Sequence, residues 1–168
     1  TRLKVEAIIQ TLNFAPDPSA RGLRSGRSFM IGLVYDNPNA EYVAEMQLGV
    51  LDATRAAGYE LIAHPCDFRS EQLASDILGF VRRLKVDGVI RLPPVSEKQD
   101  VVDELLANEV QLIRIASAQL DAKSHFVLSN DRTAAADMVQ YLIGLGHAKI
   151  GFVTGPGDFR SAQERLAG

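Results

Sequence analysis

The chain has 168 residues, 46% hydrophobic and 23% charged, which is the composition of an ordinary globular protein with one domain as the first expectation. No stretch approaches the roughly 18 consecutive apolar residues of a membrane-spanning helix, and the single cysteine, Cys66, excludes an internal disulfide. The net charge of −3 is uneven, because the first 28 residues carry +3 and the remainder −6. We therefore expect only the N-terminal end to meet a polyanion.

The first 27 residues predict two short helices separated by a break. Residues 2–12 repeat apolar side chains at the spacing of one helical face. Pro16-Asp17-Pro18 interrupts regular structure, and Pro18 suits the first turn of a second helix that ends before Gly26. The beginning of the chain inside a helix, without a cap, indicates a cut rather than a natural start. The first ten residues do not resemble a secretory signal, and the single cysteine fits a reduced cytoplasmic setting.

From residue 28 onward, strands and helices alternate. Short apolar runs predict strands at 30–35, 59–63, 86–90, 110–115, 125–128 and 149–154. Helices are expected between them, the first capped by Asn39, the second by Ser70 and the third by a capping box at Ser96, with further helices over 131–145 and from residue 161. This order predicts an α/β fold, an open parallel sheet with helices on both faces, whose ligands bind beyond the carboxyl ends of the strands.

The sequence carries no pattern typical of an enzyme. Gly155-Pro156-Gly157 follows a predicted strand but lacks the spacing of a dinucleotide-binding loop. His64, His125 and His147 are isolated from one another and do not show metal-ligand spacing. We expect no catalytic residues, no metal and no cofactor.

A set of motifs in fixed order resembles the lactose/galactose-repressor family of transcription regulators, over the whole chain. The resemblance rests on these segments: Asn13-Phe14-Ala15-Pro16-Asp17-Pro18, Ala20-Arg21-Gly22-Leu23, Ile31-Gly32-Leu33-Val34, Val86-Asp87-Gly88-Val89-Ile90, Leu145-Gly146-His147, Ile150-Gly151-Phe152 and Arg165-Leu166-Ala167-Gly168. It implies a homodimeric repressor with a periplasmic-binding-protein-like effector domain of type I, preceded by a headpiece remnant and a hinge helix. The implied divisions are 1–15 for the last, incomplete part of a helix-turn-helix headpiece, 16–27 for the hinge, 28–128 for an N-terminal subdomain, and 129–168 for the start of a truncated C-terminal subdomain.

The hinge is expected to bind operator DNA. A helix this short is marginal in water, so it should fold only when it pairs with its dimer mate on DNA. An exposed Leu23 in a basic segment fits a wedge between base steps of the minor groove. The resemblance assigns this role to Leu23, with Ala20 in the groove, and the full set of expected DNA-binding residues is Ser19, Ala20, Arg21, Leu23, Arg24 and Arg27, with the arginines on phosphates. The alternative is that 16–28 is only a polar linker.

The resemblance also implies residues for a small polar effector, a sugar or a sugar derivative. The expected effector-binding residues are Asn39, Tyr42, Arg91, Ser161 and Arg165. Two positions depart from the family pattern, because Ala116-Ser117 stands where an aspartate is usual and Arg91 where a small or apolar residue is common. Arg91 indicates either an acidic or phosphorylated effector or a structural pair with a nearby acid.

The predicted function is a DNA-binding regulator whose operator affinity depends on the effector. The alternative is a periplasmic sugar-binding protein, which would share the fold but need an export signal and no hinge.

Overall fold

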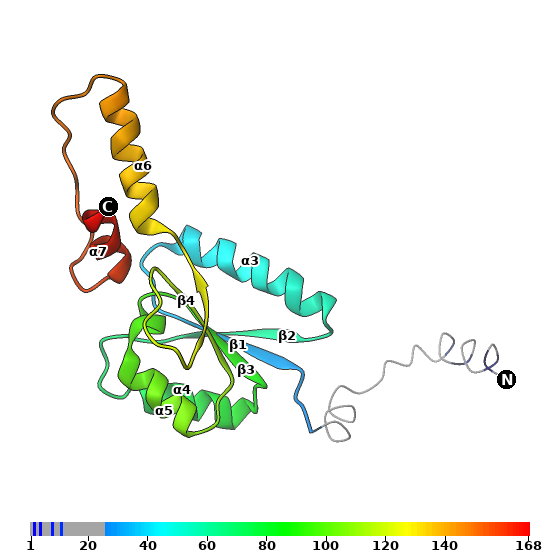
Figure 1. Ribbon diagram of the computed structural model, residues 1–168. Helices are drawn as coiled ribbons and strands as arrows, with labels where there is room; N and C mark the ends of the chain where they lie inside the picture. Colours follow the sequence, from blue (N-terminus) through cyan, green and yellow to red (C-terminus); the bar gives the residue numbers. More distant parts are fainter. Residues whose placement is uncertain (1, 3, 5–7, 9–10, 12–25) are drawn as a thin grey trace.

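The structure is a computed structural model that describes residues 2, 4, 8, 11 and 26–168 (Figure 1). The expected headpiece helix therefore lies mostly outside the described residues, and the hinge helix lies wholly outside them. The same holds for five expected DNA-binding residues, namely Ser19, Ala20, Arg21, Leu23 and Arg24.

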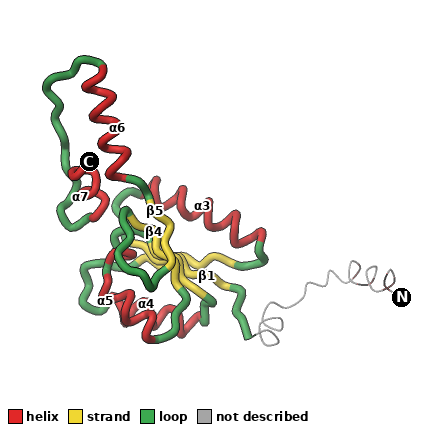
Figure 2. Tube along the Cα trace, in the orientation of Figure 1, coloured by secondary structure: helices red, strands yellow, loops and turns green. Residues whose placement is uncertain are grey.

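In the described part of the chain, five parallel strands form one sheet, in the order β2-β1-β3-β4-β5. Figure 2 shows the strands in yellow with helices on either side. The strands are β1 (Met30–Tyr35), β2 (Glu60–Pro65), β3 (Gly88–Arg91), β4 (Leu112–Ala116) and β5 (His125–Leu128). Leu33 on the central strand β1 is in register with Ala63 of β2 on one side and Ile90 of β3 on the other. The chain passes from β1 to β2 on one side and then to β3 on the other side of β1. Such a change of direction in the strand order places a ligand-binding crevice at the carboxyl ends of β1 and β3.

Helices cover both faces of this sheet, as the sequence predicts. Helix α3 (Ala40–Ala56) lies on one face, and α4 (Leu73–Leu84) and α5 (Gln99–Ala107) lie on the other (Figure 1). Asn39 caps α3, since its side-chain oxygen accepts a hydrogen bond of 3.1 Å from the Tyr42 amide. The expected α/β fold class is confirmed.

The core lies between the sheet and the α4–α5 layer. Helix α4 buries Leu73, Ile77 and Phe80, which recur at helical spacing, against Val34 and Val89 of the central strands. Gly32 lets the Phe80 ring approach β1, because a Cβ at this position would lie 2.6 Å from the ring. This packing gives the carboxyl ends of β1 and β3 a rigid support.

Two local predictions are wrong. The expected capping box at Ser96 is absent. Val95–Glu97 forms a short 3-10 helix, and the Ser96 hydroxyl instead donates a hydrogen bond of 2.5 Å to the carbonyl of Ile115. Helix α4 begins at Leu73 after a turn, and Ser70 accepts a hydrogen bond from the Gln72 amide rather than capping the helix directly. The Ser96 side chain thus bonds to strand β4, and the Ser70 side chain bonds within the turn that precedes α4.

The C-terminal segment, residues 129–168, projects from the sheet body, residues 26–128 (Figure 1). It contains α6 (Asp131–Gly144) and α7 (Arg160–Ala167), packed against each other. The predicted strand at 149–154 does not form, because no described strand lies beside it to pair with, and Val153 is 96% exposed. Met138 of α6 and Leu145, the residue after this helix, are about 60% exposed.

Candidate functional site

A cavity of about 460 Å³ lies at the carboxyl ends of the strands, between the sheet body and the C-terminal segment. Its walls from the sheet body come from the loop after β1, the first turn of α3, and the ends of β3 and β4. The C-terminal segment contributes Asp131 at the start of α6, Phe152 and Val153, and the first two turns of α7. A molecule held there would touch both parts of the chain.

Four of the five expected effector-binding residues line this cavity: Asn39, Tyr42, Ser161 and Arg165. Asn39 and Tyr42 come from the cap and first turn of α3, and Ser161 and Arg165 lie one turn apart on α7. The structure therefore brings together residues that are more than 100 positions apart in the sequence.

Asp131 is the central ionised group of the cavity. Its carboxylate accepts a hydrogen bond of 2.5 Å from the Ser129 hydroxyl and pairs at 2.6 Å with Nε of Arg165. Burial opposes ionisation of Asp131, but hydrogen bonds from Ser129, Ser117 and Arg165 outweigh burial and lower the pKa of the carboxyl below its usual value. The Asp131–Arg165 pair thus places fixed donors and acceptors in the cavity with little net charge.

Tyr42 and Glu97 complete the electrostatics of the site. Burial, followed by the negative charges of Asp131 and Glu97, raises the pKa of the Tyr42 phenol, which keeps its hydroxyl proton. Burial also raises the pKa of Glu97, although the backbone amides of Arg160 and Ser117 hydrogen-bond to its carboxylate and partly offset that effect. Among the described residues, Oε1 of Glu97 is buried without a hydrogen-bond partner.

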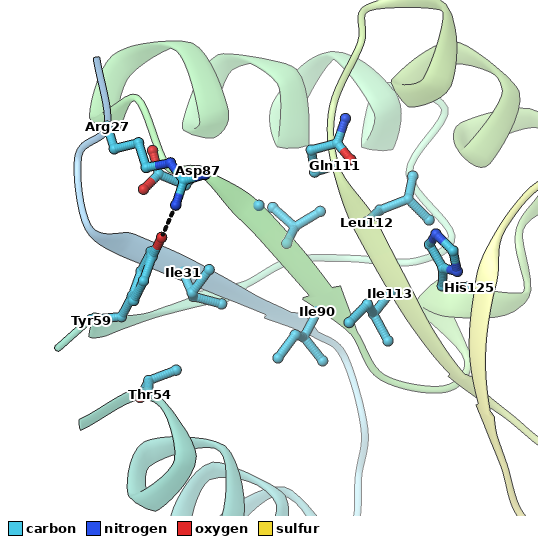
Figure 3. A pocket seen from close by; sticks show the side chains of 12 residues that line it. Arg27, Ile31, Thr54, Tyr59, Asp87, Ile90, Gln111, Leu112, Ile113 and His125 are labelled. Carbon is cyan, nitrogen blue, oxygen red and sulfur yellow. Dashed lines mark hydrogen bonds between the residues drawn. The ribbon is translucent and has the colours of Figure 1, made fainter. Parts of the chain in front are cut away.

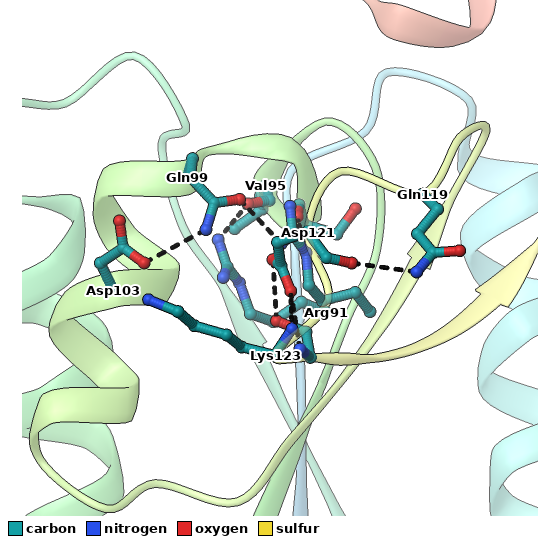
Figure 4. A network of polar contacts seen from close by, with 10 residues as sticks. Arg91, Val95, Gln99, Asp103, Gln119, Asp121 and Lys123 are labelled. Atoms are coloured by element: carbon teal, nitrogen blue, oxygen red, sulfur yellow. Dashed lines mark hydrogen bonds and ion pairs between the residues drawn. The ribbon is translucent and has the colours of Figure 1, made fainter.

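Arg91 does not line the cavity, and its expected role there is not supported by the geometry. In register it lies beside Val34 on β1, and Val34 faces the α4–α5 core, so Arg91 points to the same side of the sheet. Its side chain has no exposed surface, and it donates a short hydrogen bond to the carbonyl of Val95 (Figure 4). Burial and the adjacent charge of Arg114 lower the pKa of Arg91 to about 9.

The alternative for Arg91 was a structural ion pair with an acid, and its neighbour Arg114 makes such a pair. Arg114 lies beside Arg91 on the adjacent strand β4 and pairs with Asp121 at 2.5 Å. It also donates to the carbonyl of Ser96 at 2.6 Å and to the side chain of Gln99 at 3.0 Å. Nε and Nη1 of Arg91, by contrast, find no hydrogen-bond acceptor in the described part of the chain.

The end of the expected hinge lies at the amino ends of the central strands, opposite the first cavity. Arg27 donates a hydrogen bond of 3.3 Å to the Tyr59 hydroxyl, beside another cavity of about 570 Å³ (Figure 3). Ile31, Ile90 and Ile113 give this second cavity an apolar floor over one face of the sheet. Arg27 is thus separated from the first cavity by the length of the central strands.

Sequence reasoning missed Asp131 and Ser117 as parts of the site, and Glu97 as a charge that acts on Tyr42. The first stands at the carboxyl end of a predicted strand, which is a signal for a ligand loop. Its partner Arg165 is 34 residues away, so only the fold shows that the two side chains meet.

No helix of the described residues is long and apolar enough to cross a membrane, and none of their side chains forms a metal-ligand cluster.

Comparisons with known proteins agree with the fold and the motifs. No model of a protein family matches the chain. The ribose operon repressor of Escherichia coli K12 is 30% identical over 168 residues, which cover 98% of this chain and 50% of that repressor. Catabolite control protein A of Priestia megaterium is 30% identical over 158 residues, covering 92% of this chain and 46% of that protein. The chain spans about half the length of these relatives.

Solved structures show the same fold. A regulatory protein of the LacI family from Chloroflexus aggregans superposes with a TM-score of 0.69 at 23% identity, covering 83% of this chain and 50% of that one. The Cra regulator of Pseudomonas putida in complex with fructose 1-phosphate gives a TM-score of 0.70 at 19% identity, covering 83% of this chain and 51% of that one. Over almost its whole length the chain is thus similar in sequence to the ribose operon repressor, and it shares its fold with a regulator of the lactose/galactose-repressor (LacI) family.

Proposed function

We propose that the chain is part of a transcriptional regulator whose affinity for operator DNA is set by a small polar effector bound in the 460 Å³ cavity. The observation that carries this proposal is the composition of the cavity wall, which comes from both the sheet body and the C-terminal segment. An occupant favours one relative orientation of the two parts, and that orientation changes the affinity for DNA by linkage. The sheet body would correspond to the N-terminal effector-binding subdomain, and the C-terminal segment to the start of the second subdomain.

The chemistry of the cavity favours an uncharged polyhydroxylated molecule, a sugar. Asp131 and Arg165 neutralise each other, and Asn39, Tyr42 and Ser161 add hydroxyl and amide groups that match sugar hydroxyls. Arg91 points away from the cavity, and Arg165, the arginine among the lining residues, is paired with Asp131. Arg165, Ser161, Tyr42 and Asn39 are the proposed effector-binding residues.

The proposed DNA-binding part is the hinge, with Ser19, Ala20, Arg21, Leu23, Arg24 and Arg27, acting as a homodimer in the cytoplasm without a catalytic step. Leu23 inserts between base steps, and the arginines contact phosphates. The relatives named above are regulators, which favours this function over a periplasmic sugar-binding protein.

We expect Leu23→Ala to weaken operator binding without changing its salt dependence. Arg24→Ala should reduce the slope of log K against log salt by about 0.9, the effect of one phosphate contact.

The test uses the full-length protein with D-ribose, glucose, sucrose and fructose 1-phosphate. Thermal unfolding and calorimetry identify the sugar that binds, and operator DNA is selected by the protein from a random-sequence pool. We expect a neutral sugar to raise the melting temperature and to change operator affinity by at least about fivefold, the lower end of typical allosteric coupling. Tight binding of fructose 1-phosphate alone would contradict the neutral-effector proposal. Selection of no DNA sequence would contradict the regulator itself.

A further inference from the structure

Asp87, at the amino end of β3, holds the residues through which the chain enters the sheet. Its Oδ1 accepts hydrogen bonds from the amide of Ser28 at 2.9 Å and from the Ser28 hydroxyl at 3.2 Å. Its Oδ2 accepts one from the amide of Phe29 at 3.0 Å, and its own amide donates to the carbonyl of Met30 at 2.8 Å. One ionised side chain and its backbone thus bind three consecutive residues, and hydrogen bonds to a charged acceptor are the strong kind.

The entry segment adopts a conformation that needs such support. Phe29 has a φ of 57°, which residues other than glycine rarely adopt. Its ring packs at 5.5 Å from the ring of Tyr59, whose hydroxyl accepts the hydrogen bond from Arg27 (Figure 3). The direction of the chain at residue 27 is therefore fixed from β3 on one side and from the start of β2 on the other.

Strand β3 joins this entry segment to the effector cavity. It lies between β1 and β4, and beyond its carboxyl end Pro93 lines the cavity. The carbonyl of Pro93 accepts a hydrogen bond of 3.0 Å from Nδ2 of Asn37, which also lines it. At about 3.3 Å for each extended residue, residues 87–93 span roughly 20 Å between the two places.

We propose that Asp87 is the positioning residue that couples the effector cavity to the DNA-binding hinge. By fixing the direction in which residue 27 leaves the sheet body, Asp87 makes the hinge follow each reorientation of that body. Without this carboxylate the hinge moves independently, and occupation of the cavity no longer changes operator affinity. The inference rests on the proposed function, and it adds a residue that touches neither the effector nor DNA.

The experiment compares Asp87→Asn with Asp52→Asn in the full-length protein. Asp52 is exposed on α3, so its substitution makes the same change of charge away from the entry segment. An asparagine at 87 keeps the size of the side chain, but its amide group cannot accept the hydrogen bonds that one carboxylate oxygen accepts. Three quantities are measured: affinity for the sugar found in the panel above, affinity for the selected operator with and without that sugar, and hydrogen exchange of the amides of residues 27–30.

In Asp87→Asn we expect operator affinity to respond to the sugar by less than about twofold, well below ordinary allosteric coupling. Affinity for the sugar should stay within about twofold of wild type, while the amides of Ser28 and Phe29 exchange at least about tenfold faster, as on loss of one hydrogen bond to a charged group. A merely structural role would weaken sugar binding and thermal stability together. Asp52→Asn should behave as wild type in all three measurements.

A wild-type operator response in a folded Asp87→Asn protein would overturn the inference and leave the proposed function intact. A wild-type protein that shows no sugar-dependent operator binding would overturn both. If Asp87→Asn does not fold, Ser28→Ala decides. It removes the hydroxyl that donates to Asp87 and accepts from the Met30 amide, and an undiminished response in that variant would equally overturn the inference.

Discussion

Arg69 Nη2 lies 2.7 Å from Asp158 Oδ2, and this ion pair joins the loop after β2 to the C-terminal segment. Next to it the ring of Phe68 meets the ring of Phe159 edge-on at a centroid distance of 5.7 Å, and Phe159 lines the effector cavity. Both charged side chains are about half exposed, so the pair adds little to stability. Because the pair links the sheet body to the C-terminal segment, which form the two walls of the cavity, we expect it to act on the relative orientation of those walls.

We expect Arg69→Asp to weaken binding of the effector sugar by about two- to fivefold, the range of exposed ion pairs, with little change in melting temperature. The double variant Arg69→Asp with Asp158→Arg should recover most of the affinity, because the attraction is restored with reversed signs. Calorimetric titration of wild type, Arg69→Asp, Asp158→Arg and the double variant measures the coupling. A double variant that binds no better than the weaker single variant would show that the pair does not act on the cavity.

Arg165→Met should weaken sugar binding by at least about tenfold, since it removes a charged donor and leaves the buried Asp131 carboxylate without its ion partner. The matched control is Arg132→Met. Arg132 is as exposed as Arg165 and pairs with Glu164 at 2.9 Å, but it does not line the cavity. Equal loss of affinity in the two variants, measured by calorimetry, would contradict the role of Arg165.

The two buried arginines should respond to substitution in opposite directions. Arg91→Met removes a buried charge with two unpartnered nitrogens beside another arginine, so we expect the free energy of unfolding to rise by about 1 kcal/mol. Arg114→Met should lower it by about 3 kcal/mol, because Asp121 loses its partner. Urea unfolding of the full-length protein provides both values. Destabilisation by Arg91→Met would mean that the arginine has a partner that offsets its burial.

Glu97 gives a prediction with a definite pH dependence. Because the pKa of Glu97 is raised in the folded protein, its ionisation opposes folding. That penalty is absent below the ordinary glutamate pKa of about 4.3 and develops as the pH rises through the folded value. Glu97→Gln should therefore unfold at a higher urea concentration than wild type at pH 7 and at the same concentration at pH 4. Asp131→Asn is the control of opposite sign. The lowered pKa of Asp131 contributes stability above about pH 4 that is lost as the pH falls through the folded value.

The fold was predictable wherever a segment finds its partners within the described chain. The runs Met30–Tyr35 and Gly88–Arg91 became central strands because each has two neighbours in the sheet. The run at 149–154 is equally apolar, but a strand needs a hydrogen-bonding neighbour, and Phe152 instead lines the effector cavity. An apolar pattern predicts the capacity to form a strand, and pairing decides whether the strand forms.

The site was predictable where a motif fixes both the residue and its direction. Asn39 caps α3 and therefore faces the loop after β1, and Ser161 and Arg165 share one face of α7. Arg91 was a candidate because it stands where the family has a small or apolar residue, and an effector contact and a structural ion pair were both open. A strand residue changes faces with every step along the chain, so the side it takes depends on the register with β1.

Asp131 is at once the first residue of α6, the ion partner of Arg165 and part of the cavity wall. A substitution made there to admit a new ligand would also loosen the contact between α6 and α7. Ser117 and Phe152 line the same cavity without an ion pair to maintain. Divergence of ligand preference in this family, and deliberate redesign of it, should therefore proceed through positions such as Ser117 and Phe152 while Asp131 stays unchanged.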